Sequence, residues 1–133
     1  MPERLFTLDE AQALLDREVR ELAERMVELR TELRPLEKSW QKLVIKIGSN
    51  GGGMSADETN DMRERLEEGH EELRELLQQI VDHGVQVKDP DSGLLDFPAE
   101  IDGQPALLCW RVGEPRIAFW HSPEDGFAGR RPL

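Results

Sequence analysis

Residues 48–53 read Gly48-Ser-Asn-Gly-Gly-Gly53, and this stretch separates two long segments with helical periodicity. Glycine loses the most backbone entropy on ordering and tolerates positive φ, so the stretch predicts a turn. We therefore expect residues 48–54 to form the tip of a helical hairpin. The triple glycine follows a helix instead of a strand, and no Lys-Ser or Lys-Thr follows it, so it does not match a phosphate-binding loop.

Before the tip, apolar residues alternate steps of four and three without a lapse, which is a heptad seam. The series runs through Leu15, Val19, Leu22, Met26, Leu29, Leu33, Leu36, Trp40, Leu43 and Ile47. Thr7 and Glu10 form a capping box, so we expect a helix over about residues 8–46. Pro35 removes one backbone hydrogen bond and clashes with the preceding turn, which predicts a kink or a break after Arg34.

After the tip, Ser55 and Glu58 form a second capping box, which predicts a helix over about residues 56–82. Its apolar positions recur at Met62, Leu66, Leu73, Leu76, Leu77 and Ile80. The two seams predict an antiparallel coiled-coil hairpin over residues 1–83. The first arm is the longer one, so its N-terminal turns must pack on the strand module or on a second copy of the chain. A homodimer through the hairpin is therefore one expectation.

The period changes from helical to strand-like after Gly84. Strand-like runs, with turn sequences such as Asp102-Gly103 between them, lie at residues 85–87, 94–97, 106–111 and 116–120. They predict an antiparallel module of three to four strands over residues 84–133, with an irregular tail. The expected fold class is α+β: a long helical hairpin followed by a small sheet.

Charge and composition narrow the possible partners. The net charge is -11, and the segment from Asp57 to Asp82 contains ten acidic residues but only three arginines. Phosphate backbones and anionic lipids would therefore be repelled. We expect no direct binding to nucleic acid and no membrane segment, since no apolar run approaches the roughly 20 residues that a bilayer requires. The single cysteine, Cys109, excludes an internal disulfide, and the N-terminus shows no secretory signal, so a cytoplasmic location is expected.

His121 is the first candidate for a binding site in the strand module. It follows Trp120 at a strand end and precedes a glycine-rich turn with Arg130 and Arg131, where convergent polar groups could line a pocket. Asp96 and Arg111 complete the candidate set. The competing interpretation is a histidine that only fixes the tail by hydrogen bonds.

Cys109 and His121 could pair as nucleophile and base, with Asp96 or Asp125 orienting the imidazole. The spacing alone does not bring them together. Cys109 lies in an apolar run, where a free cysteine usually behaves as a small hydrophobic residue.

Glu67 and His70 form an E-x-x-H pair, a spacing that lets a carboxylate and an imidazole reach one iron or manganese ion in a helical bundle. A full site would need further carboxylates from helix one of a dimer, such as Glu24, Glu28 or Glu32. The alternative is a solvated acidic face with His70 beside the seam. The sequence does not imply any particular cofactor.

Several segments carry a resemblance to a known family. They are Phe6-Thr-Leu-Asp-Glu-Ala-Gln-Ala-Leu-Leu15, Gly84-Val-Gln-Val-Lys-Asp-Pro90, Gly93-Leu-Leu-Asp-Phe-Pro98, Leu108-Cys-Trp-Arg111, Trp120-His121 and Gly126-Phe-Ala-Gly-Arg-Arg-Pro-Leu133. On these segments the chain resembles the uncharacterised bacterial family named domain of unknown function 2203 (DUF2203), over nearly its whole length. The resemblance implies no activity. It directs the search for a site to the strand module, which holds most of these segments.

A second resemblance concerns the layout. A coiled-coil hairpin followed by a small β domain is similar to bacterial transcript-cleavage factors of the Gre type, which insert the hairpin tip into RNA polymerase. Gly53 and Ala56 stand where that likeness would call for two metal-positioning carboxylates, and Asp57 and Glu58 are displaced. The resemblance therefore implies a polymerase-binding factor without the cleavage carboxylates.

No complete catalytic constellation is visible in the sequence. The leading hypothesis is a non-enzymatic interaction or regulatory protein with a protein partner, in which the hairpin serves assembly and the strand module serves recognition. A metal- or cofactor-binding protein or enzyme with its site near His121 is the alternative, and the polymerase-binding factor is the third.

Overall fold

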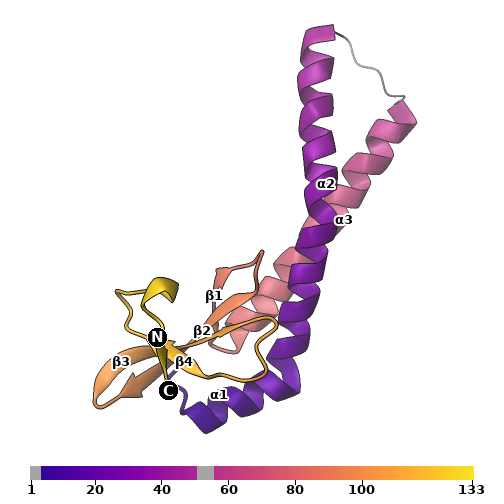
Figure 1. The fold of residues 1–133 in the computed structure, drawn as a ribbon. Helices are drawn as coiled ribbons and strands as arrows, with labels where there is room; N and C mark the ends of the chain where they lie inside the picture. Colours follow the sequence, from indigo (N-terminus) through magenta and orange to yellow (C-terminus); the bar gives the residue numbers. More distant parts are fainter. Residues whose placement is uncertain (1–3, 51–55) are drawn as a thin grey trace.

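The structure, a computed structural model, describes residues 4–50 and 56–133 as a bent helical arm that returns on a second helix into a small sheet (Figure 1). The first arm consists of α1 (Leu8–Leu14), the π-helical segment η1 (Leu15–Val19) and α2 (Arg20–Asn50). The return arm is α3 (Ala56–Asp82). Among the described residues, no helix is long and apolar enough to cross a membrane.

The helix boundaries agree with the prediction at three of the four ends. The Thr7 hydroxyl accepts from the backbone N–H of Glu10, and the Glu10 carboxylate accepts from that of Thr7, so the predicted capping box starts α1. The first arm, however, runs to Asn50 and not to about residue 46, because helix geometry persists through Gly48. The rest of the expected tip lies outside the described residues.

The expected break at Pro35 is absent, since α2 continues through it. Pro35 is exposed, so its ring stands clear of α3, and packing of the seam on both sides offsets the lost hydrogen bond. The arm also bends at η1, where α1 turns away from α2 and runs beneath the sheet (Figure 1). The N-terminal turns therefore pack on the strand module, as one of the two predicted alternatives had it.

Five strands form one antiparallel sheet in sequence order, whereas three to four were expected. They are β1 (Gln86–Asp89), β2 (Leu94–Ile101), β3 (Gln104–Arg111), β4 (Phe119–His121) and β5 (Arg131–Pro132). The tail was expected to be irregular, but it contains the short 3-10 helix η2 (Phe127–Gly129) and then β5. The α+β fold class is confirmed.

The two faces of the sheet have different roles. Leu95, Phe97 and Trp110 belong to the helix-side face and enter one apolar core with residues of α1, η1 and the near parts of α2 and α3. The other face carries Asp96 and Cys109, which alternate with those core positions. The chain after β4 turns back beside this second face (Figure 1).

Candidate metal centre

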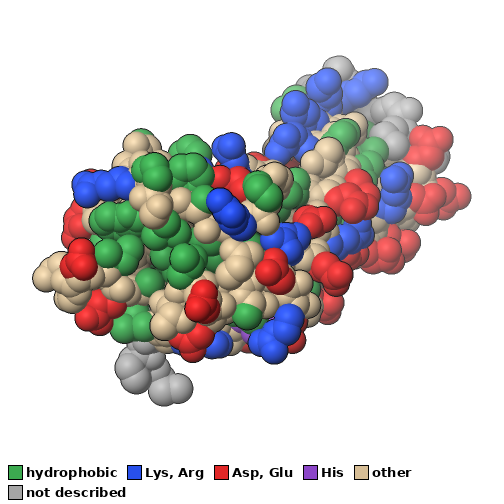
Figure 2. Space-filling view, turned by 60° about the horizontal axis from the view of Figure 1, so that its bottom comes forward, with side chains coloured by type: hydrophobic (Ala, Val, Ile, Leu, Met, Phe, Trp, Pro, Cys, Tyr) green, Lys and Arg blue, Asp and Glu red, His purple; other side chains and the backbone are tan. Residues whose placement is uncertain are grey.

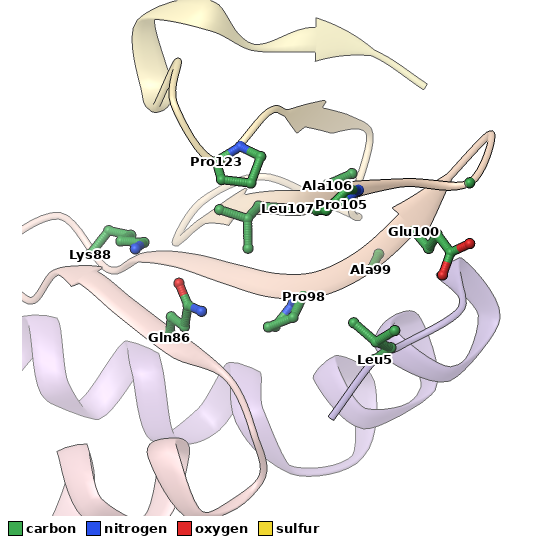
Figure 3. A pocket seen from close by; sticks show the side chains of 11 residues that line it. Leu5, Gln86, Lys88, Pro98, Ala99, Glu100, Pro105, Ala106, Leu107 and Pro123 are labelled. Carbon is green, nitrogen blue, oxygen red and sulfur yellow. The ribbon is translucent and has the colours of Figure 1, made fainter. Parts of the chain in front are cut away.

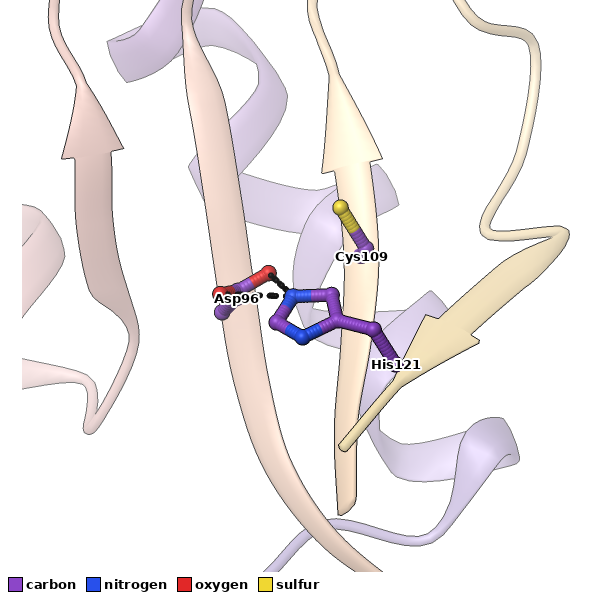
Figure 4. A group of neighbouring side chains, drawn as sticks. All are labelled: Asp96, Cys109 and His121. Carbon is purple, nitrogen blue, oxygen red and sulfur yellow. Dashed lines mark hydrogen bonds and ion pairs between the residues drawn. The ribbon is translucent and has the colours of Figure 1, made fainter. Parts of the chain in front are cut away.

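Strand register places three chemically active side chains on one face of the sheet. Asp96 on β2 pairs with Cys109 on β3, and His121 on β4 pairs with Leu107, two residues before Cys109. Directly paired residues of antiparallel strands project to the same face, and so do residues two apart. Asp96, Cys109 and His121 therefore share the face away from the helices, and Figure 4 shows them turned toward one another.

The three side chains are fully enclosed. Their exposed fractions are 1%, 0% and 2%, and one ligand-type atom from each lies within 4.8 Å of the other two. Within residues 4–50 and 56–133, this is the group of His, Cys, Asp and Glu side chains whose geometry could hold a metal ion. Buried polar groups of this kind require partners, because an unpaired charge in the interior is costly.

Hydrogen bonds fix the orientation of the imidazole. Nδ1 of His121 lies 2.7 Å from the carbonyl oxygen of Ser122, which only accepts, so Nδ1 carries a hydrogen. Nε2 lies 3.0 Å from both carboxylate oxygens of Asp96. One proton is therefore shared between Nε2 and Asp96. The backbone carbonyl at Nδ1 is the outer partner that metal-binding histidines usually have, and it leaves Nε2 as the atom that faces the centre.

The thiol is not a free nucleophile in this state. Burial raises the pKa of Cys109 to about 12, and the negative charge of Asp96 and a hydrogen bond to it add to the rise. A protonated thiol attacks poorly, so the arrangement does not favour the cysteine–histidine pair considered from the sequence. A bound cation would reverse this state, because coordination removes the proton from a thiol.

Arg130, in the C-terminal tail, contacts the backbone of one centre residue. Its Nη2 donates to the carbonyl oxygen of Cys109 at 3.3 Å and to both carboxylate oxygens of Glu114 at 2.7 and 2.9 Å. Its guanidinium also stacks over the rings of Phe119 and Phe127, at 4.2 and 4.8 Å from their centroids. Arg130 is thus a positioning residue that fastens the C-terminal segment to the backbone of a centre residue.

The other sequence candidates lie around the centre and not in it. Trp120 packs against the helix-side core, with the guanidinium of Arg131 over its ring at 5.2 Å. Arg111 is exposed and lies 5.3 Å from the ring centroid of Phe127. Asp125, the alternative partner proposed for His121, pairs with Arg131 at 3.8 Å.

Glu67 and His70 are held on the hairpin by other partners. His70 Nε2 lies 3.2 Å from Glu37 Oε1, and Glu67 lies 3.9 Å from Arg63 on the exposed side of α3. No third ligand joins them among the described residues.

The sequence contained one unused signal for the centre. Asp102 and Gly103 both have positive φ, of 53° and 78°, as a two-residue hairpin turn of type I′ requires. Such a turn fixes the register, so that positions 101 and 104 pair, and five steps along the strands Asp96 must face Cys109. No comparable rule spans the longer connection from β3 to β4, which places His121.

Comparison with known proteins returned one match. A family model described as "Uncharacterized conserved protein (DUF2203)" matches residues 4–133. No curated protein and no solved structure matches the chain.

Proposed function

The chain belongs to the DUF2203 family, whose description gives no activity, and from its own residues we propose that it is a zinc-binding protein with Asp96, Cys109 and His121 as ligands. The observation that carries the proposal is the convergence of a thiol, an imidazole and a carboxylate from three strands in one enclosed space. These three groups are the ones that zinc binds in proteins, and the thiol disfavours magnesium or calcium.

The distances fit such an ion. Zinc bonds of about 2.0–2.3 Å in tetrahedral arrangement separate ligand atoms by roughly 3.3–3.8 Å. The atoms here are separated by 3.0 Å for His121 and Asp96 and by at most 4.8 Å overall, so small side-chain rotations are sufficient. Three protein ligands leave a fourth position for water or for another molecule, which is typical of catalytic zinc sites and not of purely structural ones.

The test is metal content and affinity of the purified chain. We expect one zinc ion per chain after dialysis against zinc and chelator-buffered washing. The substitutions Asp96→Asn, Cys109→Ser and His121→Gln should each weaken zinc at least about tenfold, whereas His70→Gln serves as the matched control and should leave it unchanged. Replacement of zinc by cobalt should add a thiolate-to-metal absorption band that Cys109→Ser abolishes.

One result would contradict the proposed zinc site. Substoichiometric zinc, or zinc that the three substitutions do not affect while circular dichroism shows folded protein, would leave Asp96 and His121 as a structural pair that secures the tail.

A second candidate function is assembly through the hairpin, as the leading hypothesis from the sequence has it. Val44 and Ile45 belong to the last turns of α2, with exposed fractions of 52% and 71%. Figure 1 shows that this end of α2 is remote from the sheet. Apolar side chains exposed side by side are candidates for a protein contact. Sedimentation equilibrium should then give a dimer that Val44→Glu dissociates and Lys42→Glu does not, and a monomer at about 100 μM would exclude this dimer.

A further inference from the structure

A hollow of about 360 Å³ lies on the same sheet face as the centre. Its walls include Pro98, Leu107 and Pro123, and each of these stands two positions along the chain from a centre residue: Asp96, Cys109 and His121 respectively. Figure 3 shows these side chains around the hollow, between β2 and the chain that follows β4. The hollow and the centre are therefore neighbours, built on the same segments.

The walls are apolar and already shaped. Three of the lining residues are prolines, Pro98, Pro105 and Pro123, whose φ angles are fixed by their rings. Pro98 and Leu107 are buried, so little side-chain freedom remains to be lost when a molecule enters. A preformed apolar pocket of a few hundred Å³ is typical of a small-molecule site.

One end of the hollow is polar. Lys88 and Gln86 extend from β1, and Figure 3 shows the amine and the amide turned toward the hollow. Lys88 has no ion-pair or hydrogen-bond partner among the described residues, although acidic residues outnumber basic ones by 28 to 17 in the chain. An ammonium beside an amide matches a carboxylate, which accepts hydrogen bonds from both.

The polar end adjoins the centre. Gln86 pairs directly with Asp96 across β1 and β2, so the two side chains are neighbours on one face. Glu100 lines the opposite end and also has no ion-pair partner among the residues that the structure describes. A second carboxylate on the ligand would be repelled there, whereas an apolar end would not.

We propose that this hollow binds a small monocarboxylate with an apolar body, its carboxylate held by Lys88 and Gln86 and its body lying against Pro98, Leu107 and Pro123. Its carboxylate end lies near Asp96, which pairs with Gln86 across β1 and β2. The binding does not depend on the proposed zinc site, because none of the three centre residues lines the hollow.

The experiment titrates a panel of straight, branched and aromatic monocarboxylates of three to eight carbons into ¹⁵N-labelled protein, metal-free and zinc-loaded. Matched primary amides remove the charge, and adipate adds a second carboxylate. We expect at least one acid to give saturable shifts at β1 and at residues near Leu107, with its amide and adipate binding at least about fivefold more weakly.

Variants assign the contact. Lys88→Gln should weaken the acid at least about fivefold, Lys88→Arg should restore most of the affinity, and Lys42→Gln, which removes an equivalent charge on α2, should change nothing. The proposal is overturned if no acid binds with a Kd below about 20 mM, which corresponds to a binding free energy of about -2 kcal/mol. It is also overturned if acid and amide bind alike, or if Lys88→Gln binds the acid as the native chain does. Zinc content is measured on each sample, so loss of metal with retained acid binding defeats the zinc site alone, and the reverse result defeats the pocket alone.

Discussion

At the scale of single residues, the centre derives its character from enclosure. Asp96, Cys109 and His121 are almost fully buried on one face of the sheet, where Asp96 contacts His121 and its charge acts on Cys109. His121 shares one proton with Asp96, and the charge of Asp96 adds to the rise in the Cys109 pKa that burial causes. Zinc binding would therefore have to displace the proton of the Cys109 thiol and the proton shared by His121 and Asp96.

The raised pKa of Cys109 predicts how metal-free protein responds to alkali. The ordinary pKa is 9.0 and the folded value is about 12. Because folding raises this pKa, the stabilising contribution is complete below pH 9 and is lost as the pH rises toward 12. The free energy of unfolding should therefore fall between these values by up to about 1.4 kcal/mol per pH unit, and Cys109→Ser should lack this part of the fall.

Urea unfolding at pH 7, 9 and 10.5 measures this difference. Equal slopes for the two proteins would contradict a buried, protonated thiol. Slow reaction of the native thiol with iodoacetamide at pH 8, compared with the urea-unfolded chain, checks the same state independently.

Sequence reasoning reached the site only in part at this scale. The sequence predicts His121 as a candidate from its place at a strand end, and Asp96 as one of two residues that could orient its imidazole; the structure brings Asp96 and His121 into contact. The partnership with Cys109 was set aside because spacing says nothing about strand register, although the Asp102-Gly103 turn determines half of it. The hydrogen bond from Arg130 to the backbone of Cys109 depends on how the tail folds, which the periodicity of the sequence does not predict.

At the scale of elements, Gly69 sets how closely α2 and α3 approach. A Cβ at this position would lie 2.3 Å from the Cδ2 of Leu33, so any larger residue would force this buried side chain to shift. The helical propensity of glycine is poor, and its presence in the middle of α3 is explained by this contact. The heptad pattern predicted the pairing of the helices, but it did not predict where they come closest.

The substitution Gly69→Ala should therefore destabilise the protein. Better helix propensity would add about 1 kcal/mol of stability, but overpacking against Leu33 should cost about 1–3 kcal/mol, so we expect a net loss of up to about 2 kcal/mol. Leu33→Ala in the Gly69→Ala background should recover part of the loss that the clash causes. Thermal unfolding of the two single variants and the double variant measures this coupling, and a Gly69→Ala protein more stable than the native chain would refute the close contact.

At the scale of the whole molecule, two regions differ in the composition of their surface: the head, which is the sheet with α1, and the arm, which is the part of the α2–α3 hairpin that extends away from the sheet. Figure 2 shows hydrophobic side chains gathered on the head and charged side chains along the arm. The core that joins helices to sheet includes Leu33 on α2 and Leu66 on α3, while beyond them the two helices extend away from the sheet (Figure 1). The α+β class and the order of hairpin and sheet were predictable from periodicity, whereas the bend that folds α1 beneath the sheet was not.

Removing the distal part of the α2–α3 hairpin should not change zinc binding at Asp96, Cys109 and His121. Replacing residues 37–65 by a short glycine-rich loop removes the distal hairpin and retains the core residues on both sides. We expect unchanged zinc stoichiometry and an affinity within about threefold of the native value, since local contacts set it. Zinc titration and circular dichroism provide the measurement, and a shortened chain that folds but binds no zinc would show that the arm supports the centre.

The π-helical turn at Leu15–Val19 has a consequence for how this chain tolerates length changes. A π turn accommodates one more residue than an α turn. Deleting a single residue there would restore regular winding and so remove the bend at which α1 turns away from α2. Ala11 and Leu14 would then swing off the sheet and into solvent, so a one-codon deletion at this elbow should be far more damaging than a one-codon deletion in the arm beyond Leu36.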